Sequence, residues 1–421
     1  MSGLRFCFLT TFYPPYNFGG DGIGIQRLAR GLVRAGHQVT VVHDVEAYDF
    51  LSGKPAPEAQ PEPAGLEVIP LRSGLGALSL LLTQQLGRPV MNGRRIADIL
   101  ARGRFDAINF HNLSLIGGPG LLRYGQGVKL FMAHEHWLVC PTHVLWRHRR
   151  ELCTGRQCVR CQLTYRRPPQ LWRSTGFLER ELAHVDTFIA MSEFSRAKHK
   201  EFGFPREMEV LPYFLPDSED EGPAADTTRP QERPYFLFVG RLEHIKGLQD
   251  VIPTFAGAGD CDLLIAGDGE YGPALRRQAE GFERVRFLGR LGSADLARHY
   301  AHTLALIVPS LCFETFGIIL IEAFRQSTPV LARRLGPFPE IIEQSGGGEL
   351  FATREELVAA MRRMCDDPAR RERMGRAGRR AFEEHWRERV VVPHYLEIVR
   401  RAAERKGIGR VLDILSPGPD E

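Results

Sequence analysis

The sequence has 421 residues, of which 43% are hydrophobic and 25% charged, and this composition describes an ordinary globular protein of two or three domains. The net charge of +4 is small and the arginines are scattered, so charge alone favours neither a nucleic acid nor a membrane as partner. No apolar run approaches the roughly 20 residues of a membrane span. The longest candidate, Leu75 to Leu82, is too short.

The N-terminus lacks a secretory pattern, because the apolar run from Arg5 to Leu9 has the length of a strand and is soon followed by Pro14 and Pro15. We therefore expect a cytoplasmic protein. In that compartment the eight cysteines are more readily explained as thiols or metal ligands than as disulfides.

The first predicted strand, Leu4 to Thr11, is followed by a glycine-containing loop, a helix and a second strand, His37 to His43. Asp44 then stands where a dinucleotide fingerprint has its ribose-binding acid. The fingerprint fails at the turn, since about eight residues separate the strand from the glycines. We interpret Gly19 and Gly20 as part of a longer glycine loop that faces a cleft, with plain turn chemistry as the alternative.

Further apolar runs in the first half alternate with predicted helices, and strands are expected at residues 66–71, 107–110, 128–133 and 187–191. This alternation predicts a parallel sheet wound on both faces, whose ligands bind at the carboxyl ends of the strands. His134 directly follows one of these strands. We expect it to contact a ligand, although a capping or packing role is the alternative.

A cysteine-rich loop at residues 134–167 departs from this pattern and contains Cys140, Cys153, Cys158 and Cys161. Four thiolates from one loop could hold a tetrahedral Zn²⁺, and the last two have the spacing of a zinc knuckle. A structural zinc is our hypothesis, while reduced thiols, an iron–sulfur cluster and a redox disulfide stay open. The arginines of the loop could meet an anionic acceptor or form a solvated basic face.

The stretch from Pro216 to Pro234 is acidic and proline-rich and predicts a linker. Beyond it the alternation resumes, with strands expected at residues 235–239, 262–266, 285–288, 303–308 and 329–332 and charged helices at 354–366, 368–384 and 386–405. Arg241 and Lys246 follow the first of these strands, and a helix is expected from Leu248. The two cations make a plausible diphosphate site.

The stretch around Gly317 predicts a strand, a loop and the start of a helix. Glu314 lies in the loop and Glu322 in the helix, with seven residues between them. Backbone N–H groups at a helix start suit an anion, and carboxylates accept hydrogen bonds from hydroxyls. The segment is therefore equipped for a ligand that has both, such as a sugar nucleotide.

In order and spacing, residues 235–385 resemble the donor half of the retaining GT-B glycosyltransferases of family 4, the group 1 type. The motifs that carry the resemblance are Gly240-Arg241, Lys246-Gly247, Gly267-Asp268-Gly269, Phe287-Leu288-Gly289, Pro309-Ser310, Glu314-x7-Glu322 with Phe316-Gly317, and Pro339-Glu340. The first half resembles the family more loosely, through Gly19-Gly20 and through His134-Glu135, where the family has His-Asp. Only some members have the cysteine-rich loop.

The resemblance implies a GT-B fold, in which two facing, Rossmann-like, doubly wound α/β domains enclose an interdomain cleft. We accordingly expect an N-terminal acceptor domain at residues 1–215, with the cysteine-rich loop at 134–167, and a linker at 216–234. The donor domain would occupy residues 235–385. Residues 386–421 would form a helix that packs back toward the N-terminal domain, and a tail.

The resemblance also implies roles for single residues. Arg241 and Lys246 would hold the donor diphosphate, and the backbone N–H groups near Phe316, Gly317 and Ile318 would add to that charge stabilisation.

The hydroxyl groups of the donor would be held by acidic side chains and a histidine. Glu322 would bind the ribose, Glu314 the donor sugar, and His134 another sugar hydroxyl from the opposite domain.

The nucleobase would lie near Arg290 and Leu291, and Gly19 and Gly20 would let the backbone approach the phosphate closely. The chemistry of such enzymes needs no divalent metal or other cofactor. The leaving phosphate itself takes the acceptor's proton in a front-face displacement that retains the anomeric configuration.

We therefore expect a retaining enzyme that moves a sugar from a nucleotide diphosphate sugar, with UDP first and GDP next, to a hydroxyl acceptor. The acceptor would be a carbohydrate, a lipid-linked saccharide or a small molecule, in polysaccharide, glycolipid or secondary-metabolite glycoside synthesis. The alternatives are a nucleotide-sugar epimerase or inverting GT-B enzyme, and a non-catalytic sugar-nucleotide-binding subunit. No nucleic acid partner is expected, and peripheral contact with the inner face of a membrane is left open.

Overall fold

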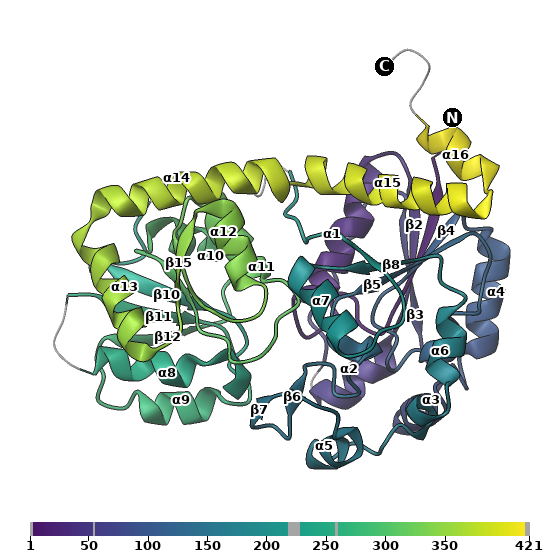
Figure 1. The fold of residues 1–421 in the computed structure, drawn as a ribbon, viewed down its shortest axis with the longest axis horizontal. Coiled ribbons are helices and arrows are strands. Elements are labelled where there is room, and N and C mark those ends of the chain that lie inside the picture. Colours follow the sequence, from purple (N-terminus) through teal and green to yellow (C-terminus); the bar gives the residue numbers. More distant parts are fainter. Residues whose placement is uncertain (1–2, 54, 218–227, 257–259, 417–421) are drawn as a thin grey trace. The chain divides into compact units, whose positions relative to one another are not determined.

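The computed structural model describes residues 3–53, 55–217, 228–256 and 260–416. The chain divides into two compact units, each with its own parallel sheet (Figure 1). Unit 1 consists of Met1–Pro212 together with Val391–Glu421, and unit 2 is the continuous segment Tyr213–Val390. In the part of the chain that is described, no helix is both long and apolar enough to cross a membrane.

The sheet of unit 1 has seven parallel strands among the described residues, in the order β3-β2-β1-β4-β5-β8-β9. The strands are β1 (Arg5–Thr10), β2 (Gln38–Asp44), β3 (Leu66–Leu71), β4 (Ala107–Phe110), β5 (Val128–Ala133), β8 (Thr187–Ala190) and β9 (Met208–Val210). The strand order reverses between β1 and β4, where an open parallel sheet has its ligand crevice at the carboxyl ends.

Helices of very different lengths surround this sheet. The helices are α1 (Gly20–Arg34), α2 (Val45–Ser52), α3 (Ala77–Leu86), α4 (Gly93–Gly103), α5 (Cys158–Thr164), α6 (Phe177–Leu182), α7 (Glu193–Glu201), α15 (Glu388–Lys406) and α16 (Gly409–Leu415). The described residues of the unit also form three 3₁₀ helices, η1 (Pro119–Leu121), η2 (His136–Leu138) and η3 (Leu171–Ser174), and a hairpin of β6 (Trp146–Arg147) and β7 (Glu151–Leu152). Every residue of β4, β5 and β8 is buried, which explains why these strands appear as continuous apolar runs.

Unit 2 has a six-stranded parallel sheet among the described residues, in the order β12-β11-β10-β13-β14-β15. Its strands are β10 (Tyr235–Val239), β11 (Asp262–Ala266), β12 (Val285–Gly289), β13 (Leu306–Val308), β14 (Val330–Arg333) and β15 (Gly348–Phe351). Its helices are α8 (Leu248–Val251), α9 (Gly272–Gln278), α10 (Ser293–His302), α11 (Ile318–Arg325), α12 (Phe338–Ser345), α13 (Arg354–Asp366) and α14 (Pro368–His385), with 3₁₀ helices η5 (His244–Lys246) and η6 (Ile252–Phe255). The order reverses between β10 and β13, so the loops after these two strands meet at one edge.

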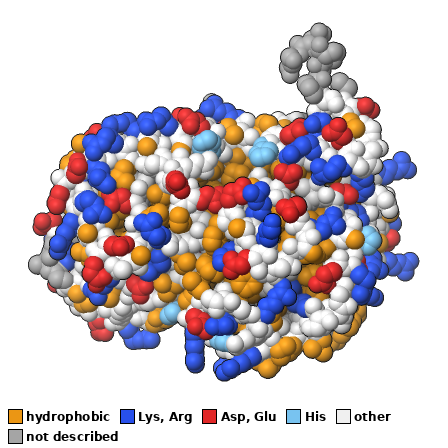
Figure 2. Space-filling view, in the orientation of Figure 1, with side chains coloured by type: hydrophobic (Ala, Val, Ile, Leu, Met, Phe, Trp, Pro, Cys, Tyr) orange, Lys and Arg blue, Asp and Glu red, His pale blue; other side chains and the backbone are white. Residues whose placement is uncertain are grey.

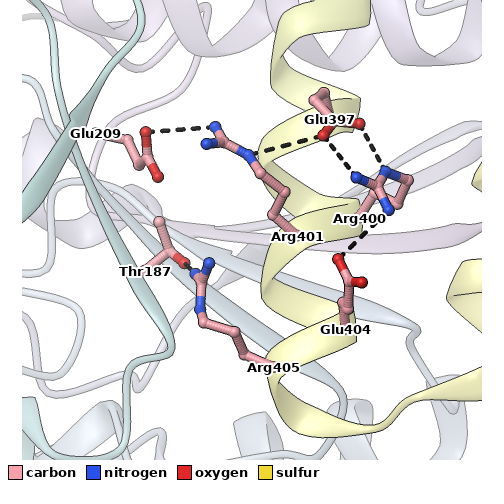
Figure 3. Close-up of polar contacts among 7 residues, drawn as sticks. All are labelled: Thr187, Glu209, Glu397, Arg400, Arg401, Glu404 and Arg405. Atoms are coloured by element: carbon pink, nitrogen blue, oxygen red, sulfur yellow. Dashed lines mark hydrogen bonds and ion pairs between the residues drawn. The ribbon is translucent and has the colours of Figure 1, made fainter.

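The long helix α15 packs across the unit 1 sheet. Its Tyr395 contacts Phe6 of β1 and Asn109 of β4, and its arginines reach β8 and β9 (Figure 3). Arg401 donates a hydrogen bond to Glu209 of β9 at 3.3 Å, and Arg405 donates one to the hydroxyl of Thr187 in β8 at 2.7 Å. Along the helix itself, Arg400 bonds Glu397 and Glu404. The C-terminal segment is therefore part of unit 1, although unit 2 separates the two in sequence.

Two features differ from the predicted elements or lie outside the structure. The helix expected from Leu248 is only four residues long and continues as η6, which contains Pro253. Because proline lacks an N–H group, it cannot extend the α-helical hydrogen-bond pattern. Most of the predicted linker, residues 218–227, lies outside the described residues.

Candidate functional site

The loops after β10 and β13 bring two predicted site residues together in unit 2. Lys246, at the end of η5, donates a hydrogen bond to the carboxylate of Glu314, with 2.6 Å between Nζ and Oε1. Ser310 donates to the same carboxylate oxygen at 3.0 Å. The two strands are neighbours in the sheet, which explains how residues 68 positions apart form this pair.

Both partners of this pair are charged at neutral pH. Burial alone would raise the pKa of Glu314, but the ammonium group of Lys246 and the hydrogen bonds keep that pKa below its usual value. Burial would likewise lower the pKa of Lys246, and the charge of Glu314 raises it instead. The site therefore presents a fixed cation and a fixed anion at the carboxyl end of the sheet.

Arg241 lies in the same β10 loop but has a different environment. Its guanidinium group is half exposed and pairs with Glu243, with 2.6 Å between Nη1 and Oε1. An exposed side chain of this kind can turn toward a ligand at little cost, since exposed ion pairs contribute only about 0–1 kcal/mol.

Glycines allow the strand ends of unit 2 to approach one another closely. A Cβ atom at Gly267 would overlap the carbonyl oxygen of Gly240, and one at Gly247 would overlap the carbonyl oxygen of Pro309. Gly267 and Gly247 also have φ angles of 145° and 75°, which side chains disfavour. The motif glycines are therefore explained by backbone packing at this edge.

The loop after β13 leads into α11, whose first residue is Ile318. Gly317 precedes the helix with a φ of 145°, and Phe316 is buried. Free N–H groups at the first turn of a helix attract anions. The predicted anion-binding segment thus has the local structure that its sequence indicated.

Glu322 lies within α11 and has a partner that the sequence did not indicate. Tyr300 of α10 donates a hydrogen bond from its phenol to the Glu322 carboxylate, at 3.2 Å. Because Tyr300 is buried, its hydrogen bond fixes the position of the Glu322 carboxylate. No motif marks this tyrosine, because the contact depends on how α10 packs on α11.

Arg290 and Leu291 directly follow β12, at the same edge of the sheet. The N–H group of Gly267 donates to the carbonyl oxygen of Gly289 at 2.7 Å, which joins the ends of β11 and β12. The position suits the predicted contact with a nucleobase, and that contact stays a prediction.

In unit 1, His134 follows β5 and meets a second histidine at the end of the adjacent strand β4. The two ring nitrogens, Nδ1 of His111 and Nε2 of His134, are 2.8 Å apart. Burial lowers the pKa of His134 to about 3 and that of His111 well below its usual value, so both are neutral at pH 7. His111 also follows a strand, and this position could have indicated it.

Two further features of unit 1 concern predicted residues. Gly19 caps α1 with an extended φ of −159°, and α1 begins at Gly20, so neither position requires a left-handed backbone. Glu135, which replaces the family's Asp, pairs with His143 at 2.8 Å. The predicted close approach of the glycines to phosphate stays a prediction.

The four cysteines of the loop are free thiols, with Cys140 and Cys161 buried and Cys153 and Cys158 partly buried. Within the described residues, no group of three or more histidine, cysteine, aspartate or glutamate side chains is placed to hold a metal ion.

Two units that each contain a doubly wound parallel sheet are typical of the GT-B fold, and solved structures with that fold superpose on this chain. Sucrose-phosphate synthase from Thermosynechococcus elongatus superposes with a TM-score of 0.73 at 19% identity, covering 96% of this chain and 100% of that one. HepE from Anabaena, solved in complex with UDP, superposes with a TM-score of 0.63 at 16% identity and covers 96% and 100% of the two chains.

The family follows from the sequence models. The model described as glycosyltransferase family 4 matches residues 18–218, and the model of glycosyl transferases group 1 matches residues 223–381. The chain therefore belongs to the family 4 glycosyltransferases of the group 1 type, as the sequence analysis predicted, and it has the predicted GT-B fold.

Individual relatives match parts of the chain. The sulfoquinovosyl transferase of Arabidopsis thaliana is 32% identical over 168 residues, which are 37% of this chain and 31% of that protein. A GDP-mannose-dependent phosphatidylinositol monomannoside mannosyltransferase of Corynebacterium glutamicum is 30% identical over 228 residues, or 48% and 58% of the two chains. The chain thus covers less than two thirds of the length of these relatives.

Proposed function

We propose that the protein is a retaining glycosyltransferase that moves a sugar from a nucleoside diphosphate sugar to a hydroxyl group of an acceptor. The observation that carries the proposal is the Lys246–Glu314 pair, which lies beside Arg241 and just before the start of α11. This cluster combines cations for a diphosphate with a carboxylate for sugar hydroxyls.

The cations act on the charge that develops when the glycosidic bond to the phosphate breaks. Lys246 is already oriented by Glu314, so little reorganisation is needed when the leaving diphosphate gains charge. Arg241 would leave Glu243 and offer its planar fork to the phosphate oxygens. The N–H groups of α11 add a third source of positive potential.

The acidic residues bind rather than exchange protons in this proposal. Glu314 has a lowered pKa and is therefore a poor proton donor at neutral pH, which favours a role in holding sugar hydroxyls. Glu322, held by Tyr300, would accept hydrogen bonds from the ribose. The leaving phosphate would take the acceptor's proton, so no side chain would have to act as the base. The cations of the protein would stabilise the departing charge in place of a metal.

His134 is neutral and sits on His111, so it could exchange one hydrogen bond with a sugar hydroxyl but would contribute no charge. Its contact with the donor sugar stays a prediction.

UDP is the first candidate nucleotide and GDP the second. The solved HepE complexes contain UDP and UDP-glucose, and the Corynebacterium relative is named as GDP-mannose-dependent. The acceptor would be a carbohydrate, a lipid-linked saccharide or a small molecule with a free hydroxyl.

The test has two stages. Thermal unfolding with a panel of nucleotides and nucleotide sugars should identify the donor, because a ligand at about 100 times its Kd adds about 2.7 kcal/mol to the free energy of unfolding. Transfer of the labelled sugar is then measured, and the anomeric configuration of the product is read by NMR. An inverted product would contradict the retaining mechanism.

Glu322→Ala is the decisive variant, with the exposed Glu280→Ala of unit 2 as its control. Loss of the ribose contact should raise KM for the donor by about tenfold or more, since a hydrogen bond to a charged group contributes about 1.5–3 kcal/mol. If both variants bind the nucleotide and transfer sugar like the parent protein, the assigned site is wrong.

A structural zinc in the cysteine loop is a separate proposal, which rests on four cysteines within one segment. The thiols would have to draw together on binding, because no three of the described side chains are placed as ligands. Elemental analysis of the purified protein decides it, and absence of stoichiometric metal would end the hypothesis.

A further inference from the structure

Exposed hydrophobic side chains are unequally distributed between the two units. All the large hydrophobic side chains that the described residues expose belong to unit 1. Six of them, with exposed fractions from 47% to 69%, lie on three short helices: Leu78, Leu81 and Leu86 of α3, Val159 and Leu163 of α5, and Leu171 of η3. We call these six residues the apolar face.

The three helices are joined to one another through a common segment. Gln84 of α3 and Gln162 of α5 both donate hydrogen bonds to the carbonyl oxygen of Pro168, at 3.0 and 3.3 Å. Trp172 of η3 donates from its indole to the carbonyl oxygen of Gln84, at 2.9 Å. The three helices that carry the apolar face therefore adjoin one another in unit 1, and Figure 2 shows hydrophobic side chains gathered where Figure 1 places α3 and α5.

The exposed leucines are not needed to hold α3 on the fold. Leu80 and Thr83 are buried on the opposite side of the helix, and Glu46 fixes the preceding loop by accepting hydrogen bonds from Ser73, Gly74 and Gly76. Contiguous exposed apolar side chains on a folded domain mark an interaction surface.

The charge beside this face is strongly one-sided. Between Pro141 and Thr175 the sequence contains eight arginines, at positions 147, 149, 150, 156, 160, 166, 167 and 173, and a single acidic residue, Glu151. Glu151 pairs with Arg147. Six of the arginines, at 149, 150, 156, 160, 166 and 167, are exposed, and no carboxylate among the described residues pairs with them.

We propose that the apolar face and its neighbouring arginines bind the surface of a bilayer that contains anionic phospholipid. Leucines would enter the boundary between headgroups and acyl chains while arginines contact lipid phosphates. A second copy of the chain is a poorer fit, because a self-complementary interface would bring two arginine-rich segments together. A nucleic acid would leave the leucines exposed. The inference does not depend on the proposed sugar transfer.

Sedimentation of the full-length protein with lipid vesicles tests the proposal. We expect binding to phosphatidylcholine vesicles with roughly 30% phosphatidylglycerol and little binding to phosphatidylcholine alone. Raising the salt from about 0.05 M to about 0.5 M should weaken it, because ions screen the arginines.

Two double variants separate the apolar and electrostatic contributions. Leu78→Gln with Leu81→Gln should lower the partition coefficient about tenfold or more, while glutamine keeps the helix stable. Arg160→Gln with Arg166→Gln should lower it about 25-fold, since each arginine near an anionic surface contributes about fivefold. The matched control neutralises two exposed arginines of unit 2, Arg362→Gln with Arg373→Gln, and should bind like the parent protein.

Several results would overturn the proposal. They are equal binding to both vesicle types, absence of binding to either, or unchanged binding of the two double variants with unchanged melting temperatures. Light scattering provides a last check, because a dimer that only Leu78→Gln with Leu81→Gln dissociates would show that a second copy covers the face.

Discussion

Each unit has its own doubly wound parallel sheet, but the polar groups at the carboxyl ends of the strands are charged in unit 2 and neutral in unit 1. Unit 2 has the charged pair Lys246–Glu314, whereas unit 1 has His111 and His134, which are buried and neutral. A common scaffold thus supports different chemistry, because the loops and not the sheet supply the reactive groups. The diphosphate of a donor would find its charged partners in unit 2.

Acid should destabilise the fold through the buried histidines of unit 1, and this is the largest effect that we expect. Burial lowers the pKa of His43 and His199 to about 4 and that of His134 to about 3, with His111 also well below its usual value. The unfolded chain binds these protons near pH 6.5, so stability is lost as the pH falls below that value. When the pH falls from about 7 to about 5, the free energy of unfolding should decrease by about 2 kcal/mol for each of these histidines.

One buried acid of unit 1 works in the opposite direction. Burial raises the pKa of Asp44 to about 6, so this group gains a proton in the folded state and offsets about 1 kcal/mol of the loss. Calorimetry at several pH values measures the net slope. His199→Asn should flatten it and the exposed His394→Asn should not, and equal slopes for both would contradict the assignment.

Lys246→Met should have the next largest effect, on catalysis by unit 2. Removing one preorganised charge from a leaving group lowers kcat/KM by about 10²- to 10³-fold, or about 3–4 kcal/mol. The variant should also lose stability, because Glu314 would remain partly buried without its cation. Transfer rates and melting temperatures are measured together.

A second variant separates the two losses. Lys246→Met with Glu314→Gln should regain stability while the rate stays low. If the transfer rate also recovered in this double variant, Lys246 would contribute to the stability of the protein and not to catalysis.

Gly267→Ala tests whether backbone packing explains the motif glycines of unit 2. Its Cβ would overlap the carbonyl oxygen of Gly240 at a φ of 145°, so we expect a loss of about 3 kcal/mol or more. Gly281→Ala is the control, because its φ of 81° is also unfavourable but no atom lies within 4 Å of the added Cβ. Denaturant unfolding should show a loss of only about 1–2 kcal/mol for the control.

The smallest effect is expected for the arginines that join α15 to the unit 1 sheet. Arg401→Ala with Arg405→Ala removes the contacts to Glu209 and Thr187, which are only partly buried (Figure 3). We expect a loss of about 1 kcal/mol or less in denaturant unfolding. A much larger loss would mean that these contacts, and not apolar packing, hold the helix.

Local patterns were sufficient to predict the strands and the charged motifs. Strands such as Val128–Ala133 and Asp262–Ala266 were predicted with their observed bounds, because strands buried on both faces are continuous apolar runs between polar loops. The segment from Gly317 into α11 was likewise evident, since a glycine before an apolar helical run marks a helix start.

Contacts that depend on strand order could not be predicted from local patterns. The sequence suggested that Lys246 and Glu314 bind separate parts of a ligand, and only the pairing of β10 with β13 brings them within hydrogen-bonding distance. Tyr300 was missed because its contact depends on how α10 packs on α11, whereas His111 directly follows a strand, and that position could have indicated it. The stretch from Leu75 to Leu82 was judged only by its length, and its exposure became evident once α3 had a buried and an open side.

The place of α15 in unit 1 has a consequence for the order in which the protein folds. As the chain leaves the ribosome, the first 212 residues emerge before the helix that packs against their sheet. Unit 2, a single continuous segment, is complete before that helix is made. Domains usually fold in the order of their synthesis. Here we expect the first unit to finish last, and the part of its sheet that α15 covers to be the region of the nascent chain most in need of protection from aggregation.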